Sequence, residues 1–317
     1  MTRWLNNVTT FTFTSVLTLT GLAQQPAPTP PAPPPVNPEF IALPATQTQI
    51  VAIVHKDITY LHASGQDLKL DVYQQPGTKK APVIVYFHGG AWWKNARPQS
   101  AASFHPLLSL GFSLVMVDYR LTGIAPAPAA IQDARCSLSW IKKNSTTYNF
   151  DPHEVIVFGT SSGGHQALMA GMLPAANDVD LPECKDQPHV AAILDFYGIS
   201  DIRPLLAEGQ TLKASSDRWV GNGPNRLTMA AQMSPVTYLR AGLPPTFIVH
   251  GDADPVVPYE QSTSLQKALK QLKVPVLLHT VPGGQHGKFT AEQSLDVGAS
   301  LQHFLDEQHL LPELQNH

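Results

Sequence analysis

The sequence predicts a doubly wound α/β fold, in which helices cover both faces of a mostly parallel β-sheet. Short apolar runs alternate with segments of helical periodicity over most of the chain. These runs are continuously apolar, as expected for strands that are buried on both faces. The segment 45–317 is long enough for one domain of this class.

The strands and helices are expected in the following order. Two strand-like segments, 50–63 and 68–75, flank a Ser-Gly-Gln-Asp turn signal and predict an antiparallel N-terminal pair. Further strands are expected at 82–87, 112–118, 154–158, 190–196, 245–250 and 274–280. Helices are expected near 100–110, 128–144, 161–172, 261–272 and 290–307. Residues 202–243 interrupt this alternation with Pro, Gly and mixed helix signals, so we expect a small cap there.

The N-terminus carries two segments of biased composition. Residues 1–23 combine Arg3, an apolar stretch and small residues at Gly21 and Ala23, which is typical of a secretory signal peptide. The apolar stretch is only about 15 residues long, too short for a stable membrane anchor. Residues 24–44 form a Pro-rich linker. We therefore expect the domain 45–317 to be secreted or periplasmic.

The charge balance excludes one class of partner, and the two cysteines allow a disulfide. The chain has 21 basic and 24 acidic residues, so it lacks the basic excess that would hold a nucleic acid. In an oxidising compartment a disulfide between Cys136 and Cys184 is allowed. The sequence gives no distance between the two residues, and a buried free Cys136 in an apolar helix is the alternative.

A Gly-rich turn follows the run EVIVF. Residues 159–164 read Gly-Thr-Ser-Ser-Gly-Gly and lead into a helical segment. This G-x-S-x-G pattern between a strand and a helix predicts a nucleophile elbow, with Ser161 as the nucleophile. The glycines are needed because neighbouring backbone segments approach closely. A Gly-rich turn without chemistry is the alternative, so the prediction depends on finding the partner residues.

A second Gly-rich segment, HGGAWW at residues 88–93, follows the run PVIVYF. Adjacent glycines after a buried strand allow backbone N–H groups to point into a site, and acyl transfer needs such donors to hold a developing oxyanion. The predicted oxyanion-hole donors are the N–H groups of Gly90, Ala91 and Ser162. The predicted substrate-binding residues are Trp92 and Trp93. At least one of them is expected to line the acyl or alcohol pocket, and plain packing is the alternative.

Two later segments supply an acid and a base. The run PTFIVH is followed by Asp252 and Asp254, and either carboxylate suits an orienting role. His286 lies on a Gly-rich loop after the last apolar run. The chain order serine, aspartate, histidine is the one expected of α/β-hydrolases. Such a set needs no metal or organic cofactor, and the histidines and cysteines show no zinc-binding spacing.

Seven segments together resemble the α/β-hydrolase esterase/lipase superfamily. They read HGGAWW, VMVDYRL, IQDARCSLSWI, FGTSSGGHQALM, FYGISD, HGDADPVVP and GGQHG, and the resemblance covers about residues 50–310. The chain is most similar to the bacterial feruloyl/acetylxylan esterase-like (BD-FAE-like) group. The resemblance implies an α/β-hydrolase fold and favours Asp254 over Asp252 as the acid. It also implies structural roles for Asp118, Arg120 and Asp133.

The sequence differs from the wider superfamily at two positions of the predicted site. The oxyanion segment reads HGGA rather than HGGG, and Ser162 stands where Ala is more usual. We expect a monomeric, secreted serine carboxylic-ester hydrolase acting on short acyl or aryl esters, including esters attached to polysaccharides. The alternatives are an arylformamidase, a prolyl-oligopeptidase-like peptidase, which would ordinarily carry a large extra domain, and a non-catalytic binding module.

Overall fold

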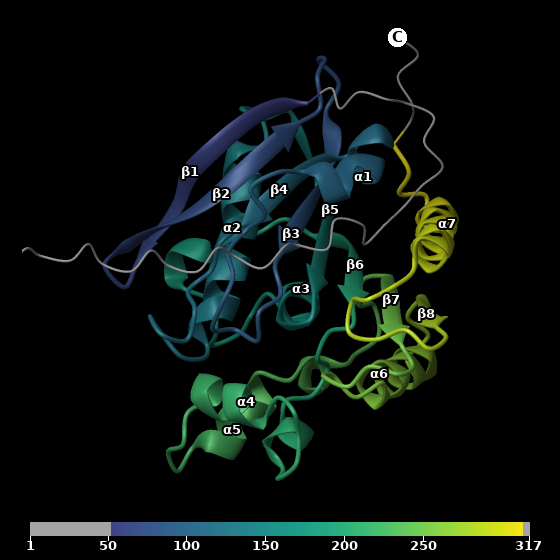
Figure 1. The fold of residues 1–317 in the computed structure, drawn as a ribbon. Coiled ribbons are helices and arrows are strands. Elements are labelled where there is room, and N and C mark those ends of the chain that lie inside the picture. Colours follow the sequence, from purple (N-terminus) through teal and green to yellow (C-terminus); the bar gives the residue numbers. More distant parts are fainter. Residues whose placement is uncertain (1–51, 313–317) are drawn as a thin grey trace, which may run out of the picture. The chain divides into compact units, whose positions relative to one another are not determined.

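A computed structural model describes residues 52–312 of the chain. The predicted signal peptide (1–23) and Pro-rich linker (24–44) lie outside the described residues. The core is an eight-stranded sheet with the strand order β1-β2-β4-β3-β5-β6-β7-β8 (Figure 1). The strands are β1 (Ile53–Ala63), β2 (Gln66–Gln74), β3 (Ala81–Phe87), β4 (Ser113–Val117), β5 (Phe150–Thr160), β6 (Val190–Phe196), β7 (Thr246–Gly251) and β8 (Val276–Val281).

The pairing of the strands confirms the predicted mostly parallel sheet. β1 pairs antiparallel with β2, and β2 pairs antiparallel with β4. The remaining neighbours from β4 to β8 are parallel. β5 begins four residues before the predicted apolar run, because Phe150 pairs with Ala81 of β3 despite the polar residues that follow it.

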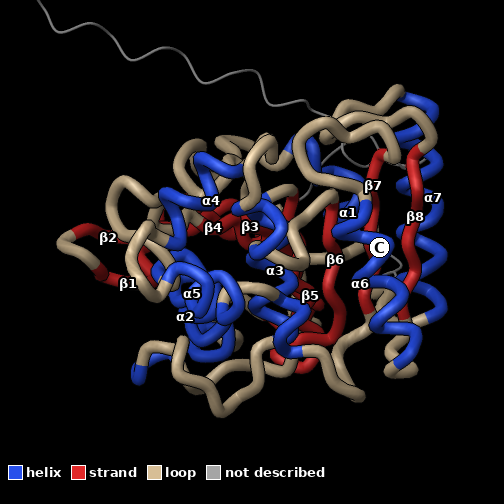
Figure 2. The backbone as a smooth tube through the Cα atoms, turned by 90° about the horizontal axis from the view of Figure 1, so that it is seen from below, coloured by secondary structure: helices blue, strands red, loops and turns tan. Residues whose placement is uncertain are grey.

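Helices cover both faces of the sheet, as the apolar runs predicted (Figure 2). The helices packed on the sheet are α1 (His105–Ser109), α2 (Ala129–Asn144), α3 (Ser162–Met172), α6 (Glu260–Gln271) and α7 (Ala291–Glu307). Alternate residues of β3 illustrate the arrangement. Ile84 and Tyr86 pack in a cluster with α1 and α7, whereas Val83 and Val85 pack in a cluster with α2, α3 and α6. Each face of the sheet therefore has its own apolar core.

The predicted cap segment lies beyond the ends toward which the central strands point (Figure 1). It contains α4 (Lys213–Val220), α5 (Arg226–Gln232) and two short 3₁₀ helices, Arg203–Leu206 and Pro235–Tyr238. Its buried residues form a third apolar cluster, in which Trp219 and Met233 of the cap pack with Trp92 and with Met169 of α3. The cap is thereby attached to elements that surround Ser161.

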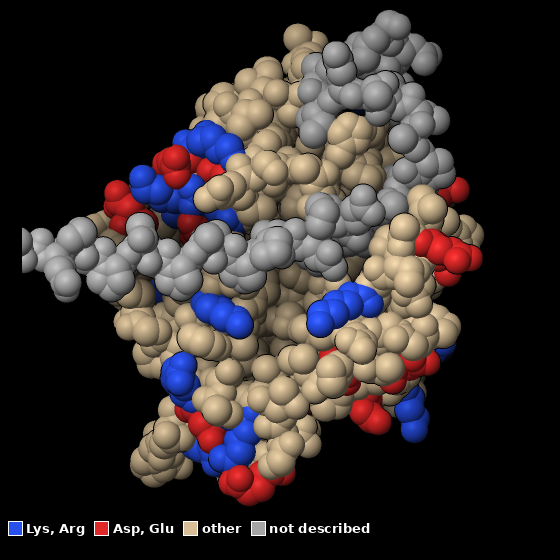
Figure 3. All heavy atoms as spheres, in the orientation of Figure 1, with Lys and Arg blue, Asp and Glu red and all other residues tan. Residues whose placement is uncertain are grey.

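Charged side chains of both signs are interspersed on the face drawn in Figure 3. No helix within residues 52–312 is both long and apolar enough to span a lipid bilayer.

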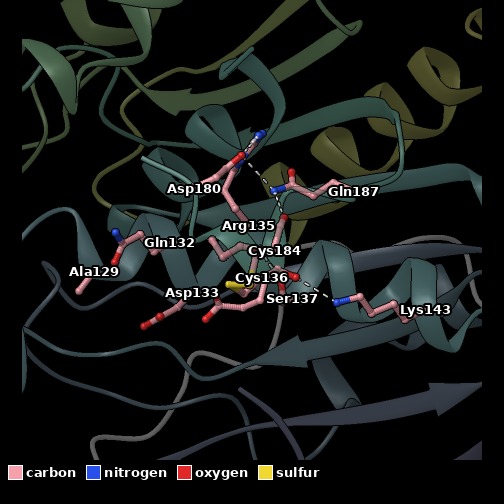
Figure 4. Close-up of a disulfide and its surroundings, with 12 residues drawn as sticks. Ala129, Gln132, Asp133, Arg135, Cys136, Ser137, Lys143, Asp180, Cys184 and Gln187 are labelled. Atoms are coloured by element: carbon pink, nitrogen blue, oxygen red, sulfur yellow. Dashed lines mark hydrogen bonds and ion pairs between the residues drawn. A yellow bond between two sulfur atoms is a disulfide. The ribbon is translucent and has the colours of Figure 1, made fainter. Parts of the chain in front are cut away.

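A disulfide and a buried ion pair hold the segment between α3 and β6 (Figure 4). Cys136 of α2 is bonded to Cys184, with a Cα–Cα distance of 4.8 Å. The neighbouring Arg135 makes two contacts of 2.7 and 2.6 Å with the carboxylate of Asp180. Arg135 also donates to the Ala170 carbonyl in the last turn of α3. Of the two possibilities that the sequence left open for Cys136, the structure has the disulfide.

We expect the disulfide to contribute substantially to stability. It closes a loop across a sequence separation of 48 residues. Chain entropy alone gives about 4 kcal/mol for a loop of this length, and crosslinks of this kind typically contribute about 2–4 kcal/mol. The double substitution Cys136→Ala/Cys184→Ala should lower the free energy of unfolding by roughly that amount, measured by urea denaturation.

Dithiothreitol should destabilise the wild-type protein similarly and leave the double variant unchanged. Equal stability of the wild type and the double variant under oxidising conditions would contradict this expectation.

Candidate active site

Ser161 occupies the sharp turn between β5 and α3. Its backbone adopts φ 56° and ψ −122°, a left-handed conformation that non-glycine residues rarely adopt. Two backbone hydrogen bonds hold this turn: Ser161 N–H donates to the Phe196 carbonyl (2.9 Å) and His165 N–H donates to the Ser161 carbonyl (3.0 Å). Strain of this kind, of order 1–3 kcal/mol, persists only where the surrounding structure stabilises it.

The two glycines of the elbow are required by close backbone contacts. A Cβ atom at Gly163 would lie 2.0 Å from the Phe87 carbonyl oxygen, at the end of β3. A Cβ atom at Gly159 would lie 2.0 Å from the Gly163 carbonyl oxygen. Both distances are far below van der Waals contact, so the close approach expected from the motif is present.

Ser161, His286 and Asp254 form a continuous hydrogen-bonded chain. Ser161 Oγ lies 2.9 Å from His286 Nε2, and His286 Nδ1 lies 2.7 Å from Asp254 Oδ2. The three residues follow β5, β8 and β7, whose carboxyl ends meet at one edge of the sheet. Asp252, the competing carboxylate, instead accepts a hydrogen bond from Gly283 N–H at 2.6 Å. The contact with His286 distinguishes Asp254 from Asp252.

The environment of Asp254 favours its ionised form. Burial by itself would raise its pKa, but contacts with His250 and His286 and a hydrogen bond from Val256 N–H outweigh burial and hold the pKa well below the usual range. Oδ1 accepts hydrogen bonds from Val256 N–H (2.7 Å) and Val257 N–H (3.0 Å). Asp254 thus presents a fixed negative charge to His286.

Tyr197, which the sequence analysis did not select, packs against the imidazole of His286. The two ring centroids lie 4.8 Å apart in an edge-on arrangement. Tyr197 has φ 43°, and its N–H donates to the Val249 carbonyl at 2.6 Å. Its position directly after β6, at the same edge of the sheet as the other site residues, is a signal that could have identified it.

The loop after β3 presents backbone donors beside the elbow. Gly90, Ala91 and Trp92 all have positive φ, and the turn is closed by hydrogen bonds from the N–H groups of Trp93 and Lys94 to the Gly90 carbonyl. The N–H groups of interest are those of Gly90, Ala91 and Ser162. Within residues 52–312 none of these three donates a hydrogen bond to another residue. They are available to an incoming acceptor.

The two tryptophans of this loop differ in exposure. Trp92 is fully buried and its indole ring is stacked on Trp219 of the cap at 4.6 Å, so it has no surface for direct contact with a ligand in this structure. The sequence predicts that at least one of the two tryptophans lines the substrate site. Trp93 is 44% exposed, and the cationic groups of Lys94 and Arg218 lie about 5 Å from its ring centroid. Trp93 can therefore contact a ligand, whereas Trp92 contributes to packing.

His165, four residues after Ser161, joins α3 to the cap and to the loop after β3 that contains Gly90 and Ala91 (the oxyanion loop). Its Nε2–H donates to the Met233 carbonyl (2.7 Å), and its Nδ1 accepts from Trp92 Nε1–H (3.2 Å). Burial lowers the pKa of His165 to about 4, so the ring is neutral and can accept at Nδ1. No local sequence pattern identifies His165 as a site residue, because its partners lie far away along the chain.

Asp195 is a buried carboxyl group beneath the elbow. Its Oδ1 has no hydrogen-bond partner within the described residues, and it lies where a Cβ atom at Gly164 or Gly198 would fall. Burial raises the pKa of Asp195 to about 7. The group is therefore protonated in the folded protein under mildly acidic conditions. Within residues 52–312 no cluster of three or more His, Cys, Asp or Glu side chains could hold a metal ion.

The raised pKa of Asp195 predicts a pH-dependent stability. In the unfolded chain an aspartate titrates near pH ~3.9. The folded state therefore holds more protons than the unfolded state between about pH 4 and 7, and this contribution to stability declines as pH rises through that window. Asp195→Asn keeps the shape but cannot ionise. Its stability relative to wild type should increase from pH 4 to pH 7 and level off above, measured by urea denaturation. A difference that does not vary with pH would contradict the prediction.

Comparisons with known proteins agree with this architecture. The family model BD-FAE matches residues 70–269. Among solved structures, a truncated carbohydrate esterase from gut microbiota superposes with a TM-score of 0.68 and 26% identity, covering 84% of this chain and 100% of that chain. Esterase Est2 of Thermogutta terrifontis with bound propionate gives a TM-score of 0.67 and 25% identity, covering 83% and 97%.

Curated sequences give the same assignment. The chain is 32% identical to the probable carboxylic ester hydrolase LipM of Mycobacterium tuberculosis, over 73% of this chain and 55% of LipM. It is 30% identical to esterase LipQ of the same organism, over 68% of this chain and 52% of LipQ. The chain thus spans about half the length of these relatives. The matching family model, the parallel sheet and the geometry around Ser161 agree, and the chain belongs to the BD-FAE family of α/β-hydrolase esterases.

Proposed function

We propose that this protein is a serine carboxylic-ester hydrolase that acts through a Ser161–His286–Asp254 triad and an acyl-enzyme. The observation that carries the proposal is the unbroken hydrogen-bonded chain from Ser161 Oγ through His286 to Asp254, beside unpaired backbone N–H groups. The esterase relatives support the same class of reaction.

In the acylation step, Ser161 Oγ attacks the ester carbonyl carbon while His286 Nε2 takes its proton. The carbonyl oxygen becomes an oxyanion, which the N–H groups of Gly90, Ala91 and Ser162 stabilise. When the tetrahedral intermediate collapses, the C–O bond to the alcohol breaks. His286 returns the proton to the leaving alcohol, and Asp254 stabilises the imidazolium that exists between these events.

Deacylation repeats the cycle with water as the nucleophile. His286 removes a proton from water as it attacks the acyl carbon, and the same three N–H groups stabilise the second oxyanion. Collapse of this intermediate releases the carboxylic acid and returns the proton to Ser161. The neutral His286 and ionised Asp254 are thereby regenerated.

Short acyl and aryl esters are the proposed substrates. The cap has two short helices, and Trp93 at the oxyanion loop offers a partly exposed aromatic surface to the acyl or alcohol group. The solved neighbours support this range, because one is named a carbohydrate esterase and the other holds propionate. Esters attached to plant polysaccharides fall within the proposed class.

We also propose that the protein is exported. The sequence of residues 1–23 supports a signal peptide. The Cys136–Cys184 disulfide is compatible with an oxidising compartment. We expect the exported enzyme to be a monomer.

Replacing Ser161 with Ala should abolish ester hydrolysis. The wild type should hydrolyse 4-nitrophenyl acetate and butyrate faster than the octanoate and decanoate. In Ser161→Ala, kcat/KM should fall by roughly 10⁴-fold or more, because the nucleophile is lost. Steady-state kinetics monitored by nitrophenolate release would test this.

An unchanged melting temperature of Ser161→Ala would show that activity is lost through removal of the nucleophile and not through loss of the fold. Methyl ferulate and N-formylkynurenine, assayed alongside, distinguish an aryl esterase from an arylformamidase. Equal, low activity of the wild type and Ser161→Ala would refute the triad and favour a non-catalytic binding module.

A further inference from the structure

A second histidine contacts Asp254 from the buried side of the site. His250 is the next-to-last residue of β7 and is fully buried. Its Nε2 lies 3.2 Å from Asp254 Oδ2, the same oxygen that accepts from His286. On the other side of the ring, Nδ1 lies 2.7 Å from Ser262 Oγ in the first turn of α6. The mechanism described above makes no use of His250 or Ser262.

The partners of His250 determine its tautomer. Nε2 faces two acceptors, the Val257 carbonyl at 3.1 Å and Asp254 Oδ2 at 3.2 Å, so this nitrogen carries the proton. Nδ1 is then the acceptor for the Ser262 hydroxyl. In a buried site the tautomer with the proton on Nδ1 would leave Nε2 facing two acceptors without a donor, at a large energetic penalty.

The contacts of His250 with Asp254 and Ser262 are similar to those of His286 with Asp254 and Ser161, except that the Nε2 hydrogen bond of His250 goes to the Val257 carbonyl and Asp254 Oδ2 lies beside it at 3.2 Å. A serine hydroxyl contacts one nitrogen of each imidazole, and the other nitrogen approaches Asp254 Oδ2. The opposite oxygen, Oδ1, is held by two backbone N–H groups, those of Val256 and Val257. The carboxylate therefore has N–H groups around both oxygens, which opposes its rotation away from His286.

We propose that His250 is a positioning residue for the reaction, which holds the Asp254 carboxylate in line with His286, and that Ser262 sets the tautomer of His250. The inference rests on the proposed esterase function. His250 has no contact with the reacting atoms and acts through Asp254. Without His250, Asp254 Oδ2 loses one of its N–H neighbours. The carboxylate can then rotate away from the orientation in which Oδ2 accepts the hydrogen bond from His286 Nδ1–H.

The test replaces His250 with Leu and with Gln. The Leu side chain fills the space but has no donor, whereas the Gln amide nitrogen falls near the position of Nε2. We expect His250→Leu to lower kcat for 4-nitrophenyl acetate by about 10- to 100-fold. Losses of this size are found when a residue that orients a metal ligand is removed, and His250 orients Asp254 in a comparable way. KM should change little. His250→Gln should recover most of the loss, and Ser262→Ala should give a smaller loss than His250→Leu.

A double-mutant cycle distinguishes positioning from a purely structural contribution. In an Asp254→Asn background, His250→Leu should cause no further loss of kcat, because the group through which His250 acts is already gone. The low-field proton resonance of His286 Nδ1–H should also shift or disappear in His250→Leu. His279 offers a matched control, since it lies on the adjacent strand β8 with its Nε2 facing Asp296. His279→Gln should leave kcat unchanged.

Several outcomes would overturn the inference. The first is an equal loss of kcat in His250→Leu and His250→Gln. The second is a loss of kcat by the same factor whether residue 254 is Asp or Asn. The third is a His250→Leu variant that folds and keeps the wild-type kcat. If His250→Leu does not fold, the comparison of His250→Gln and Ser262→Ala in the two backgrounds carries the test. If the proposed function is wrong, ester hydrolysis will not depend on Ser161. If hydrolysis depends on Ser161 but is unchanged by substitutions at His250, only the positioning role is refuted.

Discussion

The geometry of the site depends on the turn between β5 and α3, where backbone segments approach each other so closely that only glycine fits. Gly163 lies against the carbonyl of Phe87 at the end of β3, and Gly159 lies against Gly163 itself. These contacts hold the first turn of α3 against the central strands, directly after Ser161 with its left-handed conformation. They also bring the first N–H of α3 beside the loop that follows β3. The proposed nucleophile and the proposed oxyanion donors thus depend on the same backbone contacts.

The order of the strands supplies the other site residues. β3, β5, β6, β7 and β8 are successive neighbours in the sheet and run parallel, so the loops at their carboxyl ends emerge along one edge. Ser161 and His286 are 125 residues apart in the chain and yet lie in hydrogen-bonding contact. Tyr197 directly follows β6, one of the two strands between β5 and β8, and packs against the imidazole. A buried parallel sheet provides a rigid base for these loops.

The cap is joined to this base through His165. One imidazole nitrogen contacts Trp92 of the oxyanion loop, and the other contacts the Met233 carbonyl of the cap. The stacking of Trp92 on Trp219 extends the same connection. A shift of the cap would therefore be transmitted to the loop that carries the oxyanion donors and, through α3, to Ser161.

Local patterns in the sequence were enough to predict the fold and the main site residues. Continuous apolar runs predicted the parallel strands, and the G-x-S-x-G turn predicted Ser161 as the nucleophile. Both predictions were possible because the burial of a strand and the need of a tight turn for glycine depend on short segments of sequence. The position of His286 after the last strand was predictable for the same reason. The proposals for residues 1–23 and 24–44 still rest on sequence alone.

Other features depended on contacts between distant segments. Asp252 and Asp254 both follow β7, and their motif gives no indication of which one faces His286. The choice rested on family resemblance until the structure placed Asp254 beside the imidazole. Likewise, Trp92 is buried because Trp219 of the cap covers it, and Cys136 is bonded because α2 packs beside the segment that contains Cys184. The sequence by itself determined which side chains lie at the carboxyl edge of the sheet. Only tertiary packing decided which of them touch, because those contacts join segments whose separation in space is set by the whole core.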